Sequence, residues 1–188
     1  MAQQKKITYE TLYKVMEIFF RYGYKKTSLD DIAQSIGVSR QALYKHYKNK
    51  TDLFKSAVAA MLEESLVQSK NISEDASINL EDKLLNLFDI WSGQYVNIVK
   101  SHPHASEVID ATHSLIGDIV FAKQQQFISI VTDVLKDQCK SKKTSITTKQ
   151  TSETLFYTAK GICLYCENRN DYKEKMHIAI SLICNSYF

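Results

Sequence analysis

The segment from residue 27 to residue 54, TSLDDIAQSIGVSRQALYKHYKNKTDLF, constrains the fold more than any other part of the chain. Ser28 and Asp31 stand at the spacing of a capping box, so a helix is predicted to begin directly after Ser28. Gly37 follows the last apolar residue of this helix, and glycine adopts the left-handed backbone that ends a helix at least cost. Ser39 can then cap the next helix through its hydroxyl group. The segment is therefore predicted to fold as a helix-turn-helix.

The second of these helices is predicted to have one buried side and one polar side. Ala42 and Leu43 face inward, where they meet the apolar residues that recur at helical spacing on the first helix. The outward positions are Arg40, Gln41, Tyr44 and Lys45. A short helix that presents such side chains after a tight turn can enter a DNA major groove. His46 and Tyr47 lie at the boundary, and the pattern allows one of them to pack between helices.

The charge of the chain is concentrated at the same end. Residues 1–55 contain eleven Lys and Arg against five Asp and Glu, a net charge of +6, whereas residues 56–188 have a net charge of −3. A basic patch is usually no more than a solvated face. Here the positive charge lies on and beside the predicted reading helix, which favours a phosphate-facing head joined to a mildly acidic body.

This pattern resembles the TetR family of transcriptional regulators over about residues 8 to 66. Two residues depart from the family pattern: Ile36 stands where Ala is usual, and Gln41 stands where Gly is common. The resemblance implies an all-α fold, with a three-helix helix-turn-helix head at residues 6–66 and a helical ligand-binding and dimerisation body at residues 67–188. The matching residues are Thr27, Asp31, Ile32, Ala33, Gly37, Val38, Ser39, Leu43, Tyr44, His46, Tyr47, Lys50, Leu53 and Phe54.

The resemblance also implies which residues contact DNA. Arg40 and Gln41 are expected at base edges, where Arg favours guanine and Gln favours adenine. The other contacts are expected to be phosphate contacts, which position a protein without reading sequence. The whole predicted set is Thr27, Ser39, Arg40, Gln41, Tyr44, Lys45, His46 and Lys50.

The remaining chain is predicted to be helical, because a single proline and five glycines leave little material for the turns of an all-β fold. A loop is expected at residues 140–149, which are rich in Lys, Ser and Thr. The helices are predicted at about residues 8–22, 50–69, 80–99, 115–139, 150–168 and 171–187. A further helix is predicted to begin at residue 105 and to end at residue 110 or 114. By resemblance, the last two helices pack against a second copy, and a homodimer of this kind reads palindromic DNA.

A pocket for a small-molecule effector in the body is likewise implied by the resemblance. Such pockets are mostly apolar with a few polar groups, although an aromatic side chain at helical spacing is more often part of the core. Glu107, Asp110 and Ser114 share a helical face, which could favour a cationic ligand, but a solvated acidic face explains them as well. The residues proposed to line the pocket are Phe88, Trp91, Tyr95, Asp110, His113, Phe121, Phe127, Phe156 and Tyr165.

Other classes of protein are disfavoured. No apolar run is long enough to span a membrane and no signal peptide is evident, so we expect a cytoplasmic protein with reduced cysteines. Cys163 and Cys166 form a CxxC pair in an apolar stretch, where buried thiols are the better interpretation than metal binding or redox sensing. No cofactor or metal is predicted, and no catalytic motif indicates an enzyme.

The sequence thus predicts a homodimeric repressor that a small molecule releases from palindromic operator DNA. One alternative is the same kind of DNA-binding regulator without an inducer, controlled by a protein partner or by oxidation of Cys163 or Cys166. Another alternative is a helical adaptor protein whose basic head binds an acidic partner.

Overall fold

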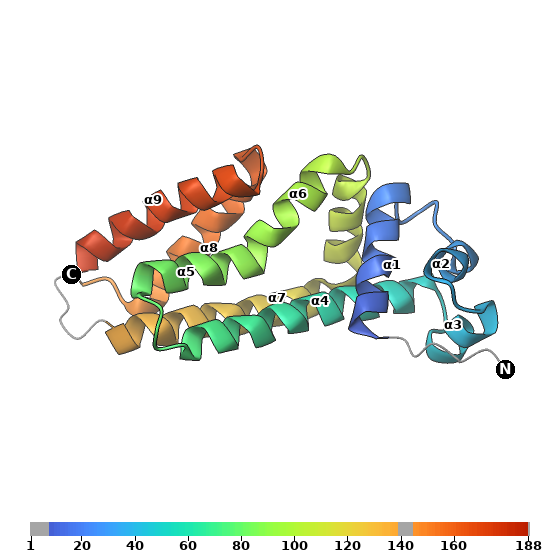
Figure 1. The fold of residues 1–188 in the computed structure, drawn as a ribbon, viewed down its shortest axis with the longest axis horizontal. Coiled ribbons are helices and arrows are strands. Elements are labelled where there is room, and N and C mark those ends of the chain that lie inside the picture. The colour runs from blue at the N-terminus through green and yellow to red at the C-terminus, as the bar shows by residue number, and fades with distance from the viewer. Residues whose placement is uncertain (1–7, 139–144, 188) are drawn as a thin grey trace. The chain divides into compact units, whose positions relative to one another are not determined.

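The computed structural model describes residues 8–138 and 145–187, and within them all regular structure is helical (Figure 1). The chain divides into two compact units. One comprises the residues up to 63 together with 101–121, and the other comprises residues 64–100 and 122 onward. The elements in chain order are α1 (Tyr9–Tyr22), α2 (Leu29–Ile36), α3 (Arg40–His46), α4 (Lys50–Glu74), α5 (Leu80–Phe88), the π-helix η1 (Asp89–Gly93), α6 (Gln94–Ser101), α7 (Ala105–Gln138), α8 (Thr148–Tyr165) and α9 (Arg169–Tyr187).

The first unit is built around aromatic side chains from α1 and α4. Phe19 and Phe54 are fully buried, and their rings meet edge to face with centroids 5.1 Å apart. Tyr24, in the loop after α1, packs on Phe54 at 4.9 Å. Leu43 of α3 is also fully buried, so the same core fixes the helix that carries the predicted reading residues. Burial of such side chains dominates the stability of a small core.

The local signals in the helix-turn-helix are confirmed. The Ser28 hydroxyl accepts from the backbone N–H of Asp31 at 3.2 Å, and the Asp31 carboxylate accepts from the backbone N–H of Ser28 at 2.9 Å. Gly37 ends α2 with φ 72° and ψ 34°, the left-handed conformation predicted for it. Ser39 accepts from the backbone N–H of Ala42 at 3.1 Å and so caps α3. These local bonds satisfy backbone groups that helix ends leave open.

The second unit is held by a stack of aromatic rings. Phe127 of α7 is fully buried and lies parallel to Trp91, with centroids 4.6 Å apart. Phe88 meets the same ring edge to face at 5.4 Å, and Phe156 of α8 lies 6.3 Å from it. The consecutive elements α5 and η1 are thereby joined in one core with α7 and α8, which lie later in the sequence.

An ion-pair cluster around the buried Asp89 lies at the π-helix of this unit. The Asp89 carboxylate accepts from the Arg169 guanidinium at 2.9 Å and 2.6 Å, and the Lys173 ammonium lies 3.0 Å away. A side chain at Gly93 would come within 2.5 Å of the Asp89 carboxylate and 2.8 Å of the Tyr172 ring. Only glycine leaves room for this approach, so Gly93 allows α9 to pack closely on η1.

Several predicted boundaries were wrong, for identifiable reasons. The helix expected at 80–99 is interrupted by η1. The break expected between residues 114 and 115 is confirmed as a kink within α7, where Ile116 has the non-helical angles φ −141° and ψ 25°. The helix expected at 150–168 ends at Tyr165, because Asn168 caps α9 instead by accepting from the backbone N–H of Asp171 at 3.1 Å. α4 runs five residues beyond its predicted end at residue 69, to Glu74.

Part of the predicted loop at residues 140–149, and the predicted helix end at Cys139, lie outside the described residues. Within the described residues, α8 already begins at Thr148. Across the same described ranges, none of the helices has the length and apolar character needed to cross a membrane.

Candidate nucleic-acid interface

α3 presents a row of polar side chains on a well-anchored base. Ala42 and Leu43 are buried with 8% and 0% of their surface exposed, as predicted. The outward residues Gln41, Lys45 and His46 are exposed. Because a helix of seven residues is too short to be stable alone, this surface depends on the packing beneath it.

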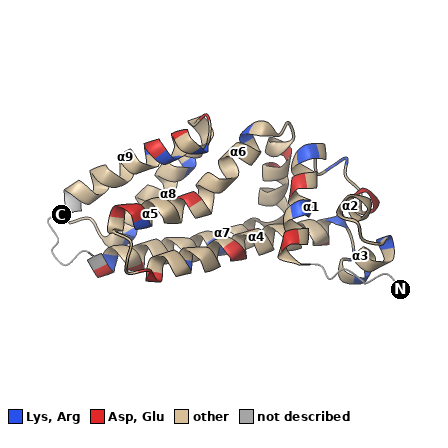
Figure 2. Cartoon of the chain, in the orientation of Figure 1, with Lys and Arg blue, Asp and Glu red and all other residues tan. Residues whose placement is uncertain are grey.

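Arg40, the first residue of α3, is held by groups on two sides. Its Nε atom lies 2.8 Å from Oδ1 of Asp30, which belongs to the first turn of α2. Its guanidinium carbon lies 5.4 Å from the centre of the Tyr44 ring, within the range of a cation–π contact. The Arg40 side chain is nevertheless 67% exposed, and that of Asp30 is 45% exposed. Figure 2 shows that the two helices carry opposite charges, with acidic residues on α2 and basic residues on α3.

Thr27 and Lys50, which are predicted to contact DNA, bond to backbone carbonyl groups inside the protein. Thr27 is buried, and its hydroxyl donates to the carbonyl oxygen of Gly23 at 2.6 Å. The Lys50 ammonium donates to the carbonyl oxygens of Tyr24 at 2.8 Å and Lys25 at 3.1 Å. An ammonium group has three N–H donors, so these bonds leave one for a phosphate. Thr27 and Lys50 therefore shape the loop that precedes α2, in addition to any contact with DNA.

The loop between α1 and α2 is also tied to the N-terminal part of α7, within the same unit. The Glu107 carboxylate accepts from the backbone N–H of Lys25 at 2.6 Å, and its second oxygen lies 3.6 Å from Nδ1 of His104. Sequence reasoning missed this role of Glu107, because 82 residues separate it from Lys25. Glu107, Asp110 and Ser114 do line one hollow of about 560 Å³, together with Tyr24 and Lys25.

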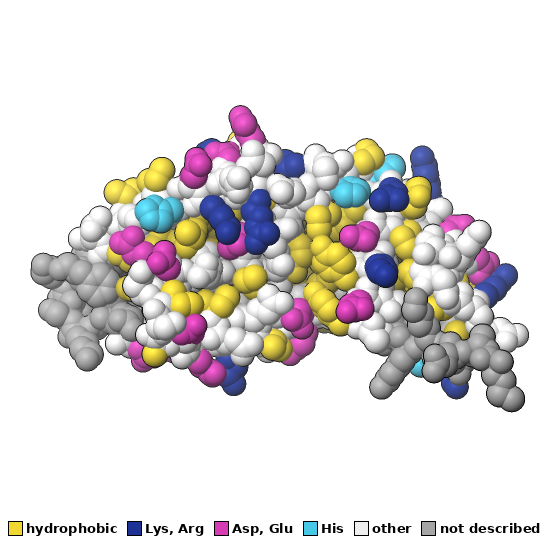
Figure 3. All heavy atoms as spheres, in the orientation of Figure 1, with side chains coloured by type: hydrophobic (Ala, Val, Ile, Leu, Met, Phe, Trp, Pro, Cys, Tyr) yellow, Lys and Arg dark blue, Asp and Glu magenta, His cyan; other side chains and the backbone are white. Residues whose placement is uncertain are grey.

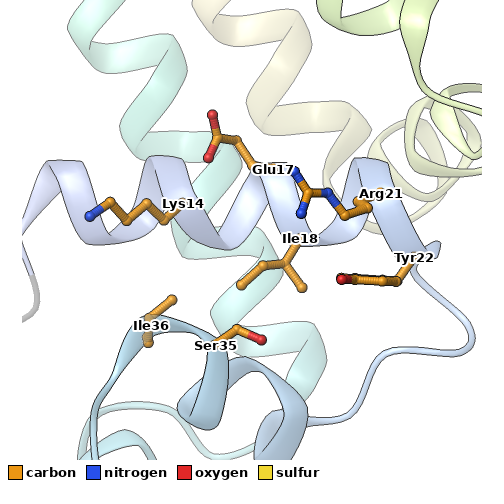
Figure 4. A pocket seen from close by; sticks show the side chains of 7 residues that line it. All are labelled: Lys14, Glu17, Ile18, Arg21, Tyr22, Ser35 and Ile36. Carbon is orange, nitrogen blue, oxygen red and sulfur yellow. The ribbon is translucent and has the colours of Figure 1, made fainter.

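A second hollow, the α1–α2 hollow, lies on the head and has a volume of about 320 Å³. Figure 4 shows its lining: Lys14, Glu17, Ile18, Arg21 and Tyr22 along α1, with Ser35 and Ile36 from α2. None of these side chains belongs to α3. The predicted DNA-contacting surface is thus a projecting helix outside this hollow, as is suitable for insertion into a groove.

The residues predicted to line an effector pocket are distributed over both units. Phe88, Trp91 and Phe156 meet around Phe127 in the core of the second unit, where each is buried. The Tyr95 hydroxyl lies 3.0 Å from Oγ of Ser65. Tyr165, on the same unit, is 84% exposed at the end of α8. The three others, Asp110, His113 and Phe121, are exposed residues of the first unit. A pocket formed by the set remains a prediction.

Of the CxxC pair, Cys166 is buried and Cys163 is half-buried. Burial, supported by the neighbouring Cys166, raises the pKa of Cys163 to about 11, although Lys100 acts in the opposite direction. Burial likewise raises the pKa of Cys166, which is 1% exposed. At neutral pH both groups are protonated and therefore weak nucleophiles. In residues 8–138 and 145–187, no group of three or more His, Cys, Asp or Glu side chains could hold a metal ion.

Comparison with known proteins matches the sequence of this head to one family. Residues 15–57 match the family model described as bacterial regulatory proteins, tetR family. The HTH-type transcriptional regulator YezE of Bacillus subtilis is 48% identical over 52 residues, which are 28% of this chain and 27% of YezE. The biofilm operon icaADBC HTH-type negative transcriptional regulator IcaR of Staphylococcus epidermidis is 39% identical over 41 residues, 22% of either chain. The chain therefore spans only about a quarter of the length of these relatives.

The fold similarity extends much further than the sequence similarity. The crystal structure of a transcriptional regulator from Rhodococcus sp. Rha1 aligns with a TM-score of 0.70 at 14% identity, and the alignment covers 95% of this chain and 96% of that one. At such identity the likeness shows the fold alone. The head carries the sequence match and the whole chain carries the fold. The head therefore matches the TetR family of transcriptional regulators in sequence, and the whole chain has the fold of solved structures that carry that family name.

Proposed function

We propose that the protein is a DNA-binding transcriptional regulator that acts as a homodimeric repressor on palindromic operator DNA. The observation that carries the proposal is the exposed polar row of α3 over its buried Ala42 and Leu43, in a head whose caps and turn form a helix-turn-helix. IcaR, which is 39% identical over 41 residues, is named a negative transcriptional regulator.

In this proposal some side chains of α3 contact bases and others contact phosphates. Arg40 and Gln41 contact base edges, where a good bidentate pair discriminates against the wrong base by roughly 1–3 kcal/mol. Tyr44, Lys45 and His46 contact phosphates, as do Ser39 at the start of α3 and the ends of neighbouring helices. Thr27 and Lys50 are included with a double role, since their side chains also hold the loop before α2.

A homodimer through α8 and α9 is the second part of the proposal. Large apolar side chains are exposed on both helices: Tyr157, Leu164 and Tyr165 on α8 are 65%, 71% and 84% exposed, and Ile178 and Leu182 on α9 are 60% and 65% exposed. Figure 3 shows apolar side chains protruding along α9. Exposed apolar patches of this kind mark interfaces, and a two-fold copy offers the same surface in return.

Control by a small-molecule effector in the C-terminal body completes the proposal, supported by the family resemblance and by the aromatic residues of residues 67–188. Oxidation of Cys163 or Cys166 is less favoured, because burial raises the pKa of both thiols. Control by a protein partner is the remaining alternative. A regulator that binds DNA in this way would act in the cytoplasm, and this location is part of the proposal.

The decisive experiment selects bound duplexes from a random DNA library with the purified protein at low salt. We expect a palindrome whose half-sites are about one helical turn apart. Arg40→Ala and Gln41→Ala are expected to relax sequence preference, whereas Lys45→Ala should weaken all duplexes and reduce the salt dependence. Failure to enrich any sequence would refute DNA readout and favour the adaptor alternative.

The dimer is tested separately by sedimentation at micromolar concentration. Ile178→Glu places a charge in the exposed apolar surface of α9 and is expected to yield monomers. Val67→Glu is the matched control, because Val67 is 48% exposed on α4, outside the proposed interface. A wild-type protein that sediments as a monomer would exclude the dimer.

A further inference from the structure

The ion pair between Asp30 and Arg40 joins the two helices of the helix-turn-helix at the site where DNA is proposed to bind. Oδ1 of Asp30 is shielded from solvent, and the Arg40 Nε atom lies 2.8 Å from it. Asp30 is part of the first turn of α2, between Ser28 and Asp31, the two residues of the capping box. The position of Asp30 is therefore set by the start of α2, and its carboxylate restrains the exposed Arg40 side chain through the ion pair.

We propose that Asp30 is a positioning residue that determines the base preference of Arg40. The inference rests on the proposed DNA-binding function. Asp30 engages Nε, the inner nitrogen of the guanidinium, and the N–H groups at the far end of the two terminal nitrogens remain available to a base. Two parallel N–H donors are what the O6 and N7 atoms of guanine accept in the major groove. The Tyr44 ring, 5.4 Å from the guanidinium carbon, limits movement on another side.

The sign of the charge supports this role. A carboxylate beside a DNA-contacting helix repels phosphates, so Asp30 lowers the affinity for every duplex alike. A restrained arginine, by contrast, loses less conformational freedom when it binds the correct base. Asp30 is therefore expected to lower the affinity for all duplexes and to increase the difference in affinity between the correct and the wrong base.

The experiment first identifies the base pair read by Arg40. In the selected operator, this is the position at which Arg40→Ala abolishes the preference. The measured quantity is the ratio of the dissociation constants for the best and the next-best base there. Asp30→Asn keeps the shape of the side chain and removes its charge. Asp30→Glu keeps a carboxylate, and Glu17→Gln removes an equal charge from the exposed face of α1, in the α1–α2 hollow.

We expect Asp30→Asn to reduce this ratio about twofold to fivefold, the range that corresponds to the coupling of an exposed ion pair. The affinity for unrelated duplexes should stay the same or increase. Asp30→Glu should retain most of the ratio, and Glu17→Gln should leave it unchanged. In an Arg40→Ala background, Asp30→Asn should have no further effect on the ratio, because the residue acts through Arg40.

Three results would overturn the inference. The ratio of Asp30→Asn could equal that of Glu17→Gln, Asp30→Asn could lower the ratio further without Arg40, or Arg40→Ala could leave every preference intact. Each of these leaves the proposed function standing, provided the wild type enriches a palindrome. A wild type that enriches no sequence refutes the proposed function itself. Thermal unfolding of each variant confirms that the ratios compare folded proteins.

Discussion

Removal of the Asp89 charge should loosen α9 from the core of the second unit. The Asp89 side chain is 7% exposed, and it is the shared anion of Arg169 and Lys173, both on α9. Asp89→Asn keeps the size of the side chain but leaves these two cations without their counter-charge. Since α9 carries part of the proposed dimer surface, the change is expected to weaken the helix on which assembly depends.

The magnitude follows from the geometry of the cluster. Removing one partner of a buried ion pair costs about 3–5 kcal/mol, because the remaining charge stays unpaired in the interior. Here Arg169 and Lys173 are 39% and 40% exposed, so both can recover some hydration. We therefore expect a loss of about 2 kcal/mol in the free energy of unfolding. For a chain of this size, this corresponds to a fall of about 4–8 °C in Tm.

The dependence on pH gives a second signature. Burial alone would raise the pKa of Asp89, but the hydrogen bonds and charges of Arg169 and Lys173 outweigh it and hold the pKa below its ordinary value of 3.8. A carboxyl group with a depressed folded-state pKa stabilises the fold above its unfolded pKa, and this contribution disappears as pH falls through the folded pKa. The difference between wild type and Asp89→Asn should thus be full at pH 7 and shrink below about pH 4.

Urea unfolding followed by circular dichroism, at pH 7 and at several acidic pH values, measures both effects. Asp133→Asn is the matched control. Asp133 pairs with Lys136 at 2.9 Å, but the two side chains are 64% and 60% exposed, so a loss below about 0.5 kcal/mol is expected. A loss equally small for Asp89→Asn, or one that persists unchanged in acid, would refute the reasoning about the buried cluster.

Three further predictions concern the two units. Gly37→Ala should cost about 1 kcal/mol by urea unfolding, because a Cβ atom there meets no heavy atom within 4 Å and the penalty is that of a left-handed backbone at φ 72°; a neutral result would contradict this. Phe54→Ala should lower the free energy of unfolding by about 3–5 kcal/mol, since it removes ring contacts to Phe19 and Tyr24. Near-native stability of this variant would show that Phe54 is not central to the core. Cys163 should react with a disulfide reagent about ten times faster for each pH unit between pH 7 and 10, because the pKa of its thiol is raised to about 11. The rate is measured in a variant whose other cysteines are replaced by serine. A rate that levels off near pH 8 would show an ordinary thiol.

Local chemistry accounts for the parts of the fold that the sequence predicted well. The cap at Ser28, the turn at Gly37 and the cap at Ser39 each depend on residues three or four positions away, so their spacing is visible in the sequence. The buried positions of α3 follow from helical periodicity in the same way.

The interactions that sequence reasoning missed are those made across the fold. Lys50 bonds to a carbonyl oxygen 26 residues away, and Glu107 bonds to a backbone N–H 82 residues away. Such pairs arise only once tertiary packing brings their helices together. The close packing at the end of the π-helix is also non-local, because Tyr172, whose ring lies next to Gly93, is about 80 residues later in the chain.

The shortness of α2 and α3 has a consequence for how activity is lost. Helices of eight and seven residues have almost no helical population on their own in water. The proposed DNA-reading surface is therefore not a separate module that could survive partial melting. It forms and melts in one cooperative transition with the core at Phe19 and Phe54. Substitutions far from any nucleotide, in that core, should abolish repression as completely as changes in α3, and heat should switch off binding over the same few degrees in which the head unfolds.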